Sequence, residues 1–174
     1  MRPIVAIACV AISLAAAKNI GAEEMPHING ETLSGKKLEF PSVTAGSVAI
    51  IFIGFSHASQ SQLKAWTDEA NKQLRNNAHV MIYDMAVLED APRFVRGMAV
   101  HGMKSGTPAA EYDRFAVVYQ GEPELKRVTA FQRSDEAYIL LLDPKGDIKW
   151  VSHGKPTDEA IKELTKQVEA LLPK

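Results

Sequence analysis

A continuous run of apolar residues, Val48-Ala49-Ile50-Ile51-Phe52-Ile53, constrains the fold of this chain more than any other feature. Runs of this length that are rich in β-branched residues are typical of strands buried on both faces. Such strands occur mainly in α/β sheets, because there helices cover both faces. Ser56 follows the run and is a favoured residue type at a helix N-cap. The segment therefore predicts a central strand over 47–55 that leads directly into a helix.

The residues after Ser56 have helical periodicity. Leu63, Trp66, Ala70 and Leu74 lie three or four positions apart, which places them on one face of a helix. We expect this face to pack on the sheet. Trp66 and the second tryptophan, Trp150, are both predicted to be packing residues.

The rest of the chain alternates between predicted strands and helices. We predict strands over 37–40, 79–85, 114–119, 137–142 and 148–152, and helices that begin near Pro92, Glu124 and Thr157. Phe94, Val95 and Met98 give the helix after Pro92 an apolar side, and its methionines are expected to fill the core. Asp143-Pro144-Lys145-Gly146 is a tight-turn sequence that joins the last two strands as a hairpin. This order predicts an α/β fold, a three-layer α/β/α sandwich with a central mixed sheet and an N-terminal extension.

The first 22 residues have the pattern of a targeting segment. Arg2 is followed by an uncharged apolar stretch from Pro3 to Ala17, which is too short for a spanning helix and suits a signal peptide. Cleavage after Ala17 or after Ala22 fits the small-residue pattern. The alternatives are an uncleaved N-terminal anchor and, more weakly, a lipoprotein processed at Cys9. We therefore expect a signal peptide over 1–22, a single domain over 23–174, and export, most simply to a periplasm.

Charge and cysteine content exclude several classes of function. The net charge of −1 and the lack of a polybasic run argue against a nucleic-acid partner and against membrane-surface binding. The single cysteine, Cys9, excludes an intramolecular disulfide, a dithiol pair and a multi-cysteine zinc site. After cleavage no cysteine would remain, and no stable membrane insertion is expected. His79, His101 and His153 are not spaced as ligands on one element, so no metal and no cofactor are expected.

Two segments resemble those of thioredoxin-fold proteins. Residues 140–150, Leu-Leu-Leu-Asp-Pro-Lys-Gly-Asp-Ile-Lys-Trp, are similar to the hairpin that ends redoxins, peroxiredoxins and Sco-type copper chaperones. Residues 52–58, Phe-Ile-Gly-Phe-Ser-His-Ala, resemble the Sco-type approach to the first copper-binding cysteine. The resemblance covers about 26–172 and implies the redoxin-like branch of the thioredoxin fold.

The reactive positions of that fold are occupied by other residues here. Ala58 and Gln62 stand where the Sco pattern has its cysteines, and Asp135 stands where it has its histidine. Aligned as a thioredoxin, the reactive pair falls near His57 and Gln60. Because a thiolate is the nucleophile of dithiol exchange and peroxide reduction, the resemblance predicts the fold without its usual redox chemistry.

One family fits these departures. The chain is similar to the mitochondrial ATP-synthase assembly factors and their bacterial relatives, which are thioredoxin-like and commonly lack the cysteine pair. The similarity lies in Pro26 and Gly30, the turn at 35–37, the helix start at 56–66 and the hairpin at 143–150. It implies an assembly or chaperone-like role with a protein partner in the cell envelope.

The turn that begins the first helix is the candidate site. Ser56, His57, Ser59 and Gln60, with Ser61, are predicted to form a polar binding pocket, because unpaired N–H groups at a helix N-terminus favour anions. The alternative is a capping sequence with an exposed histidine. Acid–base work by His57 would need a carboxylate, and Asp84 and Asp135 are the nearest candidates. No catalytic residue is assigned.

Two functions from different classes remain open on the sequence. The first is an exported, redox-inactive binding or assembly factor. The second is a thiol-independent enzyme, or a small-ligand or metal binder, that uses the His57 turn. A metal site at His101 with Met98 and Met103 is the weakest form of the second.

Overall fold

A central strand buried along its whole length organises the protein. The computed structural model describes residues 23–173, and the predicted signal peptide lies outside them. Strand β4 (Val48–Gly54) is the predicted apolar run, and all seven of its residues are buried. Beside it lie β5 (Val80–Val87), which is parallel, and β7 (Ala137–Leu142), which is antiparallel.

The described strands form one mixed sheet in the order β1-β8-β7-β4-β5-β6-β2-β3. The remaining strands are β1 (Glu23–Glu24), β2 (Ile28–Thr32), β3 (Lys37–Phe40), β6 (Phe115–Val118) and β8 (Asp147–His153). The helices are α1 (Gln60–Leu74), α2 (Arg93–Gly106), α3 (Glu122–Val128) and α4 (Asp158–Leu171). Short 3-10 turns precede β4, α1 and β6.

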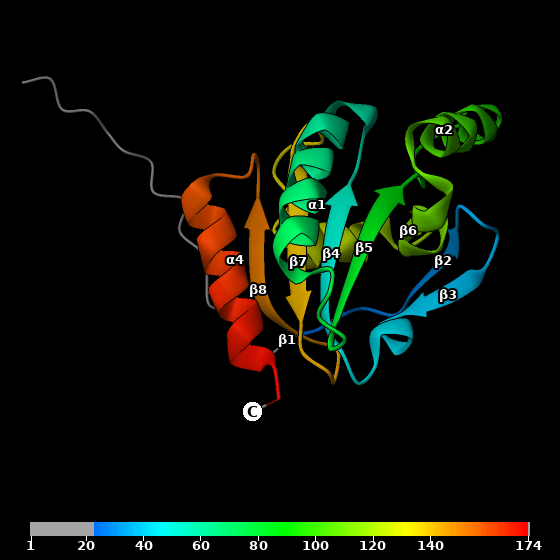
Figure 1. The fold of residues 1–174 in the computed structure, drawn as a ribbon. Coiled ribbons are helices and arrows are strands. Elements are labelled where there is room, and N and C mark those ends of the chain that lie inside the picture. The colour runs from blue at the N-terminus through cyan, green and yellow to red at the C-terminus, as the bar shows by residue number, and fades with distance from the viewer. Residues whose placement is uncertain (1–22, 174) are drawn as a thin grey trace, which may run out of the picture.

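Alternation along β4 divides the core between the two faces of the sheet. Val48, Ile50 and Phe52 face a cluster that contains side chains of α1 and α4. Ala49 and Ile51 face the opposite cluster, which includes Leu125 of α3 and residues of the N-terminal strands. Figure 1 shows α1 and α4 in front of the sheet and α3 behind it. The predicted three-layer arrangement is confirmed.

The N-terminal extension becomes part of the sheet. Strand β2 pairs antiparallel with β6 and with β3, which extends the sheet beyond β6. At the opposite edge, β1 pairs with β8. The sequence predicted a short strand at 37–40 but did not predict where in the sheet this segment lies. None of the described helices is long and apolar enough to cross a membrane.

Helix α2 departs from the prediction that its apolar side packs on the core. It begins after Pro92 as predicted, but none of its side chains is buried. Phe94 is 80% exposed and Met98 is 74% exposed, so the interpretation of Met98 as a core residue is wrong. In Figure 1, α2 lies at the margin of the molecule, beyond the end of β5 and away from α1 and α4. Half-burial of Val95, Ala99 and Met103 shows that the opposite side of α2 faces the body.

Candidate functional site

Gly54 allows the first turn after β4 to lie directly against the end of the strand. A Cβ atom at this position would stand 2.5 Å from Leu63 Cδ1 and 2.8 Å from Ser59 Oγ. A side chain at position 54 would force Leu63 and Ser59 to move, so glycine fits this close approach. The chain then turns at Ser56 and enters a 3-10 turn, His57–Ser59, which continues into α1.

The two serine hydroxyls of the predicted site bind the protein's own backbone. Ser56 Oγ accepts a hydrogen bond from the Ala58 amide at 3.2 Å, which confirms the predicted cap, and donates to the Ser134 carbonyl at 2.6 Å. Ser59 is fully buried, and its hydroxyl donates to the Ser56 carbonyl at 2.8 Å. These hydroxyls therefore hold the turn in shape.

His57 and Gln60 differ from the two serines in their exposure to solvent. Both residues are exposed, as is Ser61. They are the members of the predicted set whose side chains face solvent and are able to meet a ligand or partner. Binding by this turn remains a prediction.

Gln62, which stands at a position of the missing thiols, joins the turn to the chain before β7. Its side-chain amide donates to the Asp135 carbonyl at 3.1 Å, and its Oε1 accepts from the Ala137 amide at 3.2 Å. One side chain thus satisfies a carbonyl and an N–H of the same backbone segment. With the Ser56 bond to Ser134, this fastens the 56–62 turn to the 134–137 loop.

Tyr138 holds the residues that come just before the 134–137 loop. The Tyr138 hydroxyl accepts hydrogen bonds from the Gln132 and Arg133 amides and donates to the Arg133 carbonyl, each at 2.9 Å. Arg133 binds the Asp135 carboxylate through two nitrogens, at 3.0 and 2.6 Å. This ion pair lowers the pKa of Asp135, and Asp135 is therefore engaged locally and not by His57.

A histidine–carboxylate pair lies near the same end of the sheet and was not predicted. His153 Nδ1 lies 2.8 Å from Glu136 Oε2, and the imidazole ring stacks on Tyr138 at 5.9 Å. His153 is the cross-strand partner of Tyr138 in the β7–β8 pair. The hairpin prediction over 137–152 contained the signal, because antiparallel pairing sets the end of β8 opposite the start of β7.

Asp84, the other carboxylate considered for His57, is engaged by α1. Its Oδ1 accepts a hydrogen bond from the Thr67 hydroxyl at 2.5 Å. Burial raises the pKa of Asp84 to about 7, and the Thr67 hydrogen bond only partly offsets this rise. The carboxyl group is therefore an acid that titrates near neutrality at the α1 face of the sheet.

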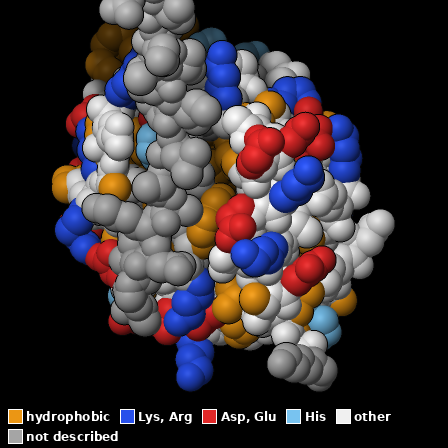
Figure 2. All heavy atoms as spheres, turned by 90° about the vertical axis from the view of Figure 1, so that its left-hand side faces the viewer, with side chains coloured by type: hydrophobic (Ala, Val, Ile, Leu, Met, Phe, Trp, Pro, Cys, Tyr) orange, Lys and Arg blue, Asp and Glu red, His pale blue; other side chains and the backbone are white. Residues whose placement is uncertain are grey.

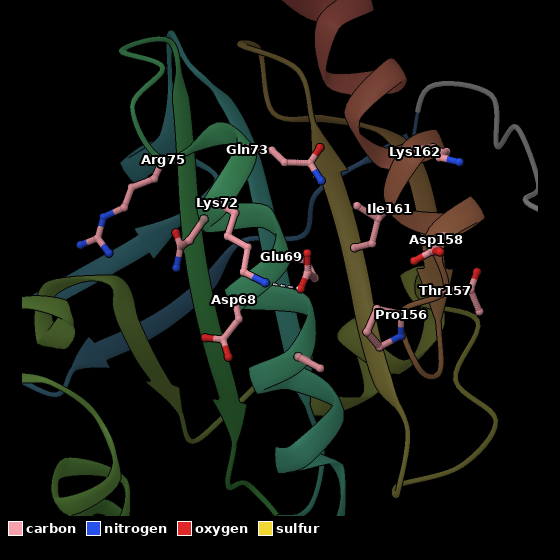
Figure 3. A pocket seen from close by; sticks show the side chains of 12 residues that line it. Asp68, Glu69, Lys72, Gln73, Arg75, Pro156, Thr157, Asp158, Ile161 and Lys162 are labelled. Carbon is pink, nitrogen blue, oxygen red and sulfur yellow. Dashed lines mark hydrogen bonds and ion pairs between the residues drawn. The ribbon is translucent and has the colours of Figure 1, made fainter.

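A hollow in the surface lies away from the predicted turn. A groove of about 880 Å³ runs between the outer side of α1 and the start of α4. Figure 3 shows Asp68, Glu69, Lys72 and Gln73 on one side and Pro156 to Lys162 on the other, with Lys72 bonded to Glu69. Half of the residues that line it are charged, and it is open to solvent. Within residues 23–173, no group of three or more His, Cys, Asp or Glu side chains is placed to hold a metal ion.

The fold class follows from the arrangement of six elements, β4, α1, β5, β7, β8 and α4. The protein has a thioredoxin fold, as its similarity to solved structures shows. It superposes on BsSco, a member of the Sco family of cytochrome c oxidase assembly proteins, with a TM-score of 0.62 at 14% identity, covering 91% of this chain and 99% of that one. A protein described as the thiol:disulfide interchange protein DsbE from Chlorobium tepidum gives a TM-score of 0.61 at 14% identity, with 90% and 100% covered.

The exposed lipoprotein thioredoxin Etrx1 from Streptococcus pneumoniae gives a TM-score of 0.57 at 13% identity, covering 83% of this chain and 99% of that one. At these identities the similarity establishes the fold alone.

The family is established by sequence. Residues 15–171 match the model of the ATP10 protein family, whose members are ATP synthase assembly factors, and the chain belongs to this family. The comparison with curated proteins finds no significant match.

Proposed function

We propose that the protein is a thiol-independent assembly factor that binds a protein partner of the ATP synthase assembly route. Membership of the ATP10 family supports the assembly role. The absence of cysteine from residues 23–174 supports independence from thiol chemistry, because neither dithiol exchange nor peroxide reduction proceeds without a thiolate.

The contacts of Gln62 are the observation that carries this proposal. A side chain at a thiol position of the fold binds two backbone groups of the facing loop instead of a substrate. The turn and the loop thereby form one fixed surface, on which His57, Gln60 and Ser61 are exposed. A preformed surface loses little conformational entropy on binding, which suits recognition of a protein.

The assembly role is tested by deleting the gene in the source organism and measuring intact ATP synthase on native gels. Wild-type protein should restore the complex, and the double variant His57→Ala/Gln60→Ala should restore it several-fold less well. His79→Ala, which removes an exposed imidazole at the opposite end of the sheet, is the matched control and should behave as wild type. Full restoration by the double variant would show that the His57 turn does not take part in assembly.

Redox inactivity has a separate test. The purified protein should give no turnover above background in insulin-reduction and peroxide-reduction assays. The variant Cys9→Ser should restore ATP synthase as well as wild type does. Turnover, or loss of restoration in Cys9→Ser, would show that a thiol takes part.

We also propose that residues 1–22 direct export and that the folded domain works in a periplasm. The support is the basic residue, short apolar stretch and small residues of this segment. Alkaline phosphatase is active only when it is exported from the cytoplasm. A fusion of residues 1–22 to this enzyme should therefore be active. N-terminal sequencing of the exported chain distinguishes cleavage after Ala17, cleavage after Ala22 and an uncleaved anchor.

A second candidate, binding of a small anion at the His57 turn, is supported by the exposure of His57 and Gln60 beside the start of a helix. Inorganic phosphate should then raise the melting temperature of wild type but not of His57→Ala. Equal shifts in both proteins would exclude this candidate.

A further inference from the structure

The outer face of α2 carries the large hydrophobic side chains that are most exposed in the described part of the chain. Phe94 and Met98 are one helical turn apart and therefore lie on the same face. The face continues through His101 and Ser105, which are also exposed. Since two large apolar side chains are kept in water here, the face has no partner within residues 23–173.

The charges on α2 are all of one sign. The helix carries Arg93, Arg96 and Lys104 and no acidic residue. Arg93 and Lys104 are exposed. Arg96 is turned toward the body, where it donates to the carbonyls of Ala91 and Glu89 and lies over the ring of Tyr119.

Most of the acidic groups near α2 have partners of their own in the body of the protein. The Glu89 carboxylate accepts a hydrogen bond from the Glu122 amide, and Glu111 and Asp113 pair with Arg75 and Lys36. Asp90 lies just before the helix and is 3.9 Å from Lys126. By contrast, acidic and basic side chains are interspersed on the face shown in Figure 2, which is the side of the molecule that carries α4.

We propose that the outer face of α2 docks on an anionic lipid surface. Phe94 and Met98 enter the boundary between headgroups and acyl chains, while Arg93 and Lys104 meet the lipid phosphates. A helix with an apolar stripe beside positive side chains is suited to lie in this interface. The proposal departs from the expectation, drawn from overall charge, that the chain does not bind a membrane surface. Net charge is a sum over the whole chain and does not show that positive side chains gather on one helix.

The small size of the apolar stripe favours lipid over a protein partner. A stable protein interface buries about 800 Å² on each side, which is more than two side chains and their neighbours supply. Weak, reversible attachment to a bilayer needs only a few apolar side chains together with positive charges. The marginal position of α2 in Figure 1 leaves its outer face free to approach a plane.

Vesicle sedimentation tests the proposal. The chain 23–174 is used, because it leaves out the apolar stretch 3–17, which would itself bind lipid, and a cooperative thermal transition checks that it is folded. It should sediment with vesicles of phosphatidylcholine and phosphatidylglycerol in a 7:3 ratio, and at least about tenfold less with phosphatidylcholine alone, since anionic headgroups supply the attraction. Phe94→Ser/Met98→Ser should lose at least about tenfold in binding to the anionic vesicles. Both side chains are exposed, so its melting temperature should match wild type.

A matched pair of charge variants separates the helix from overall charge. Arg93→Gln/Lys104→Gln should weaken binding, whereas Lys145→Gln/Lys155→Gln, with the same change in net charge at two exposed sites elsewhere, should not. Equal loss in the two pairs, or no binding to anionic vesicles, would overturn the proposal. In the latter case, a mass of two chains in analytical ultracentrifugation that Phe94→Ser/Met98→Ser abolishes would identify a second copy as the occupant. The experiment contains no ATP synthase, so its outcome is independent of the proposed assembly role.

Discussion

Individual residues hold the turn and its facing loop in shapes that the neighbouring sequence would not adopt alone. Gly54 permits a close contact between the strand end and the turn that a Cβ atom would disturb. The Tyr138 hydroxyl makes three hydrogen bonds to the backbone of Gln132 and Arg133. These are polar and steric requirements of single positions. A change at such a position alters the free energy of unfolding by an amount that its contacts predict.

Ala130 is the clearest case of backbone strain. It follows the last turn of α3 with φ of 51°, and the amides of Ala130 and Phe131 donate to the carbonyls of Arg127 and Lys126. This is a helix C-terminus that glycine normally occupies, because a Cβ is unfavourable in the left-handed conformation. We expect Ala130→Gly to raise the free energy of unfolding by about 0.5–1 kcal/mol in urea denaturation. Ala45→Gly, at a loop residue with φ of −54°, is the control and should not stabilise.

Asp84 should make stability depend on pH. Its pKa of about 7 in the folded protein exceeds the ordinary value of 3.8, so the folded state holds the proton more tightly than the unfolded state. The free energy of unfolding is therefore expected to fall as pH rises from about 4 to about 7, and to level off above that.

The variant Asp84→Asn should lack this fall, since an amide keeps the acceptor for Thr67 and carries no charge. At pH 8 we expect it to be more stable than wild type by on the order of 2 kcal/mol, because the half-buried carboxyl keeps some contact with water. Urea denaturation at pH 4.5 and pH 8 measures the difference. Parallel stabilities of the two proteins over this range would contradict the assignment.

At the scale of the element, α1 and α2 show why an apolar pattern alone does not predict packing. Both have an apolar side at helical spacing. In α1 that side lies on β4, with Trp66, Ala70 and Leu74 buried, whereas in α2 no side chain is buried, and Phe94 and Met98 remain in water. The periodicity shows only that a helix is amphipathic. Whether its apolar side is buried depends on where the connecting segments place the helix relative to the sheet.

Gln62 links α1 to the loop before β7, and its removal should loosen that loop. Gln62→Ala leaves the Asp135 carbonyl and the Ala137 amide without their partners, so we expect a loss of about 1–3 kcal/mol in the free energy of unfolding. The Ala137 amide should also exchange with deuterium faster. Gln73→Ala, which removes an exposed hydrogen bond on the same helix, should change stability by less than about 0.5 kcal/mol. Unchanged exchange at Ala137 would contradict the linking role.

At the scale of the molecule, Trp66 connects three parts of the fold. It is fully buried, stacks on Phe52 of β4 at 6.2 Å, and donates from Nε1 to the Gly154 carbonyl at 2.8 Å. Gly154 lies between β8 and α4. One side chain therefore holds the first helix, the central strand and the approach to the last helix together.

A pair of tryptophan variants isolates the hydrogen bond from the loss of volume. Trp66→Phe and Trp150→Phe remove the same atoms from buried positions, but Trp150 Nε1 has no hydrogen-bond partner in the described part of the protein. We expect Trp66→Phe to cost about 1 kcal/mol more than Trp150→Phe in the free energy of unfolding. Equal costs in thermal or urea denaturation would show that the Gly154 bond contributes nothing.

The sequence by itself determined the central strand, the order of strands and helices from residue 37 onward, the hairpin at 143–146 and the absence of thiols from the turn after β4. These depend on local patterns, because periodicity, caps and turn residues act over a few positions. Only the tertiary structure decided where the N-terminal strands pair, that Gln62 binds the loop before β7, that His153 meets Glu136, and that α2 keeps Phe94 and Met98 in water. Each of these joins positions far apart in the chain or depends on whether a surface is covered, and the residues near a position in sequence do not contain that information.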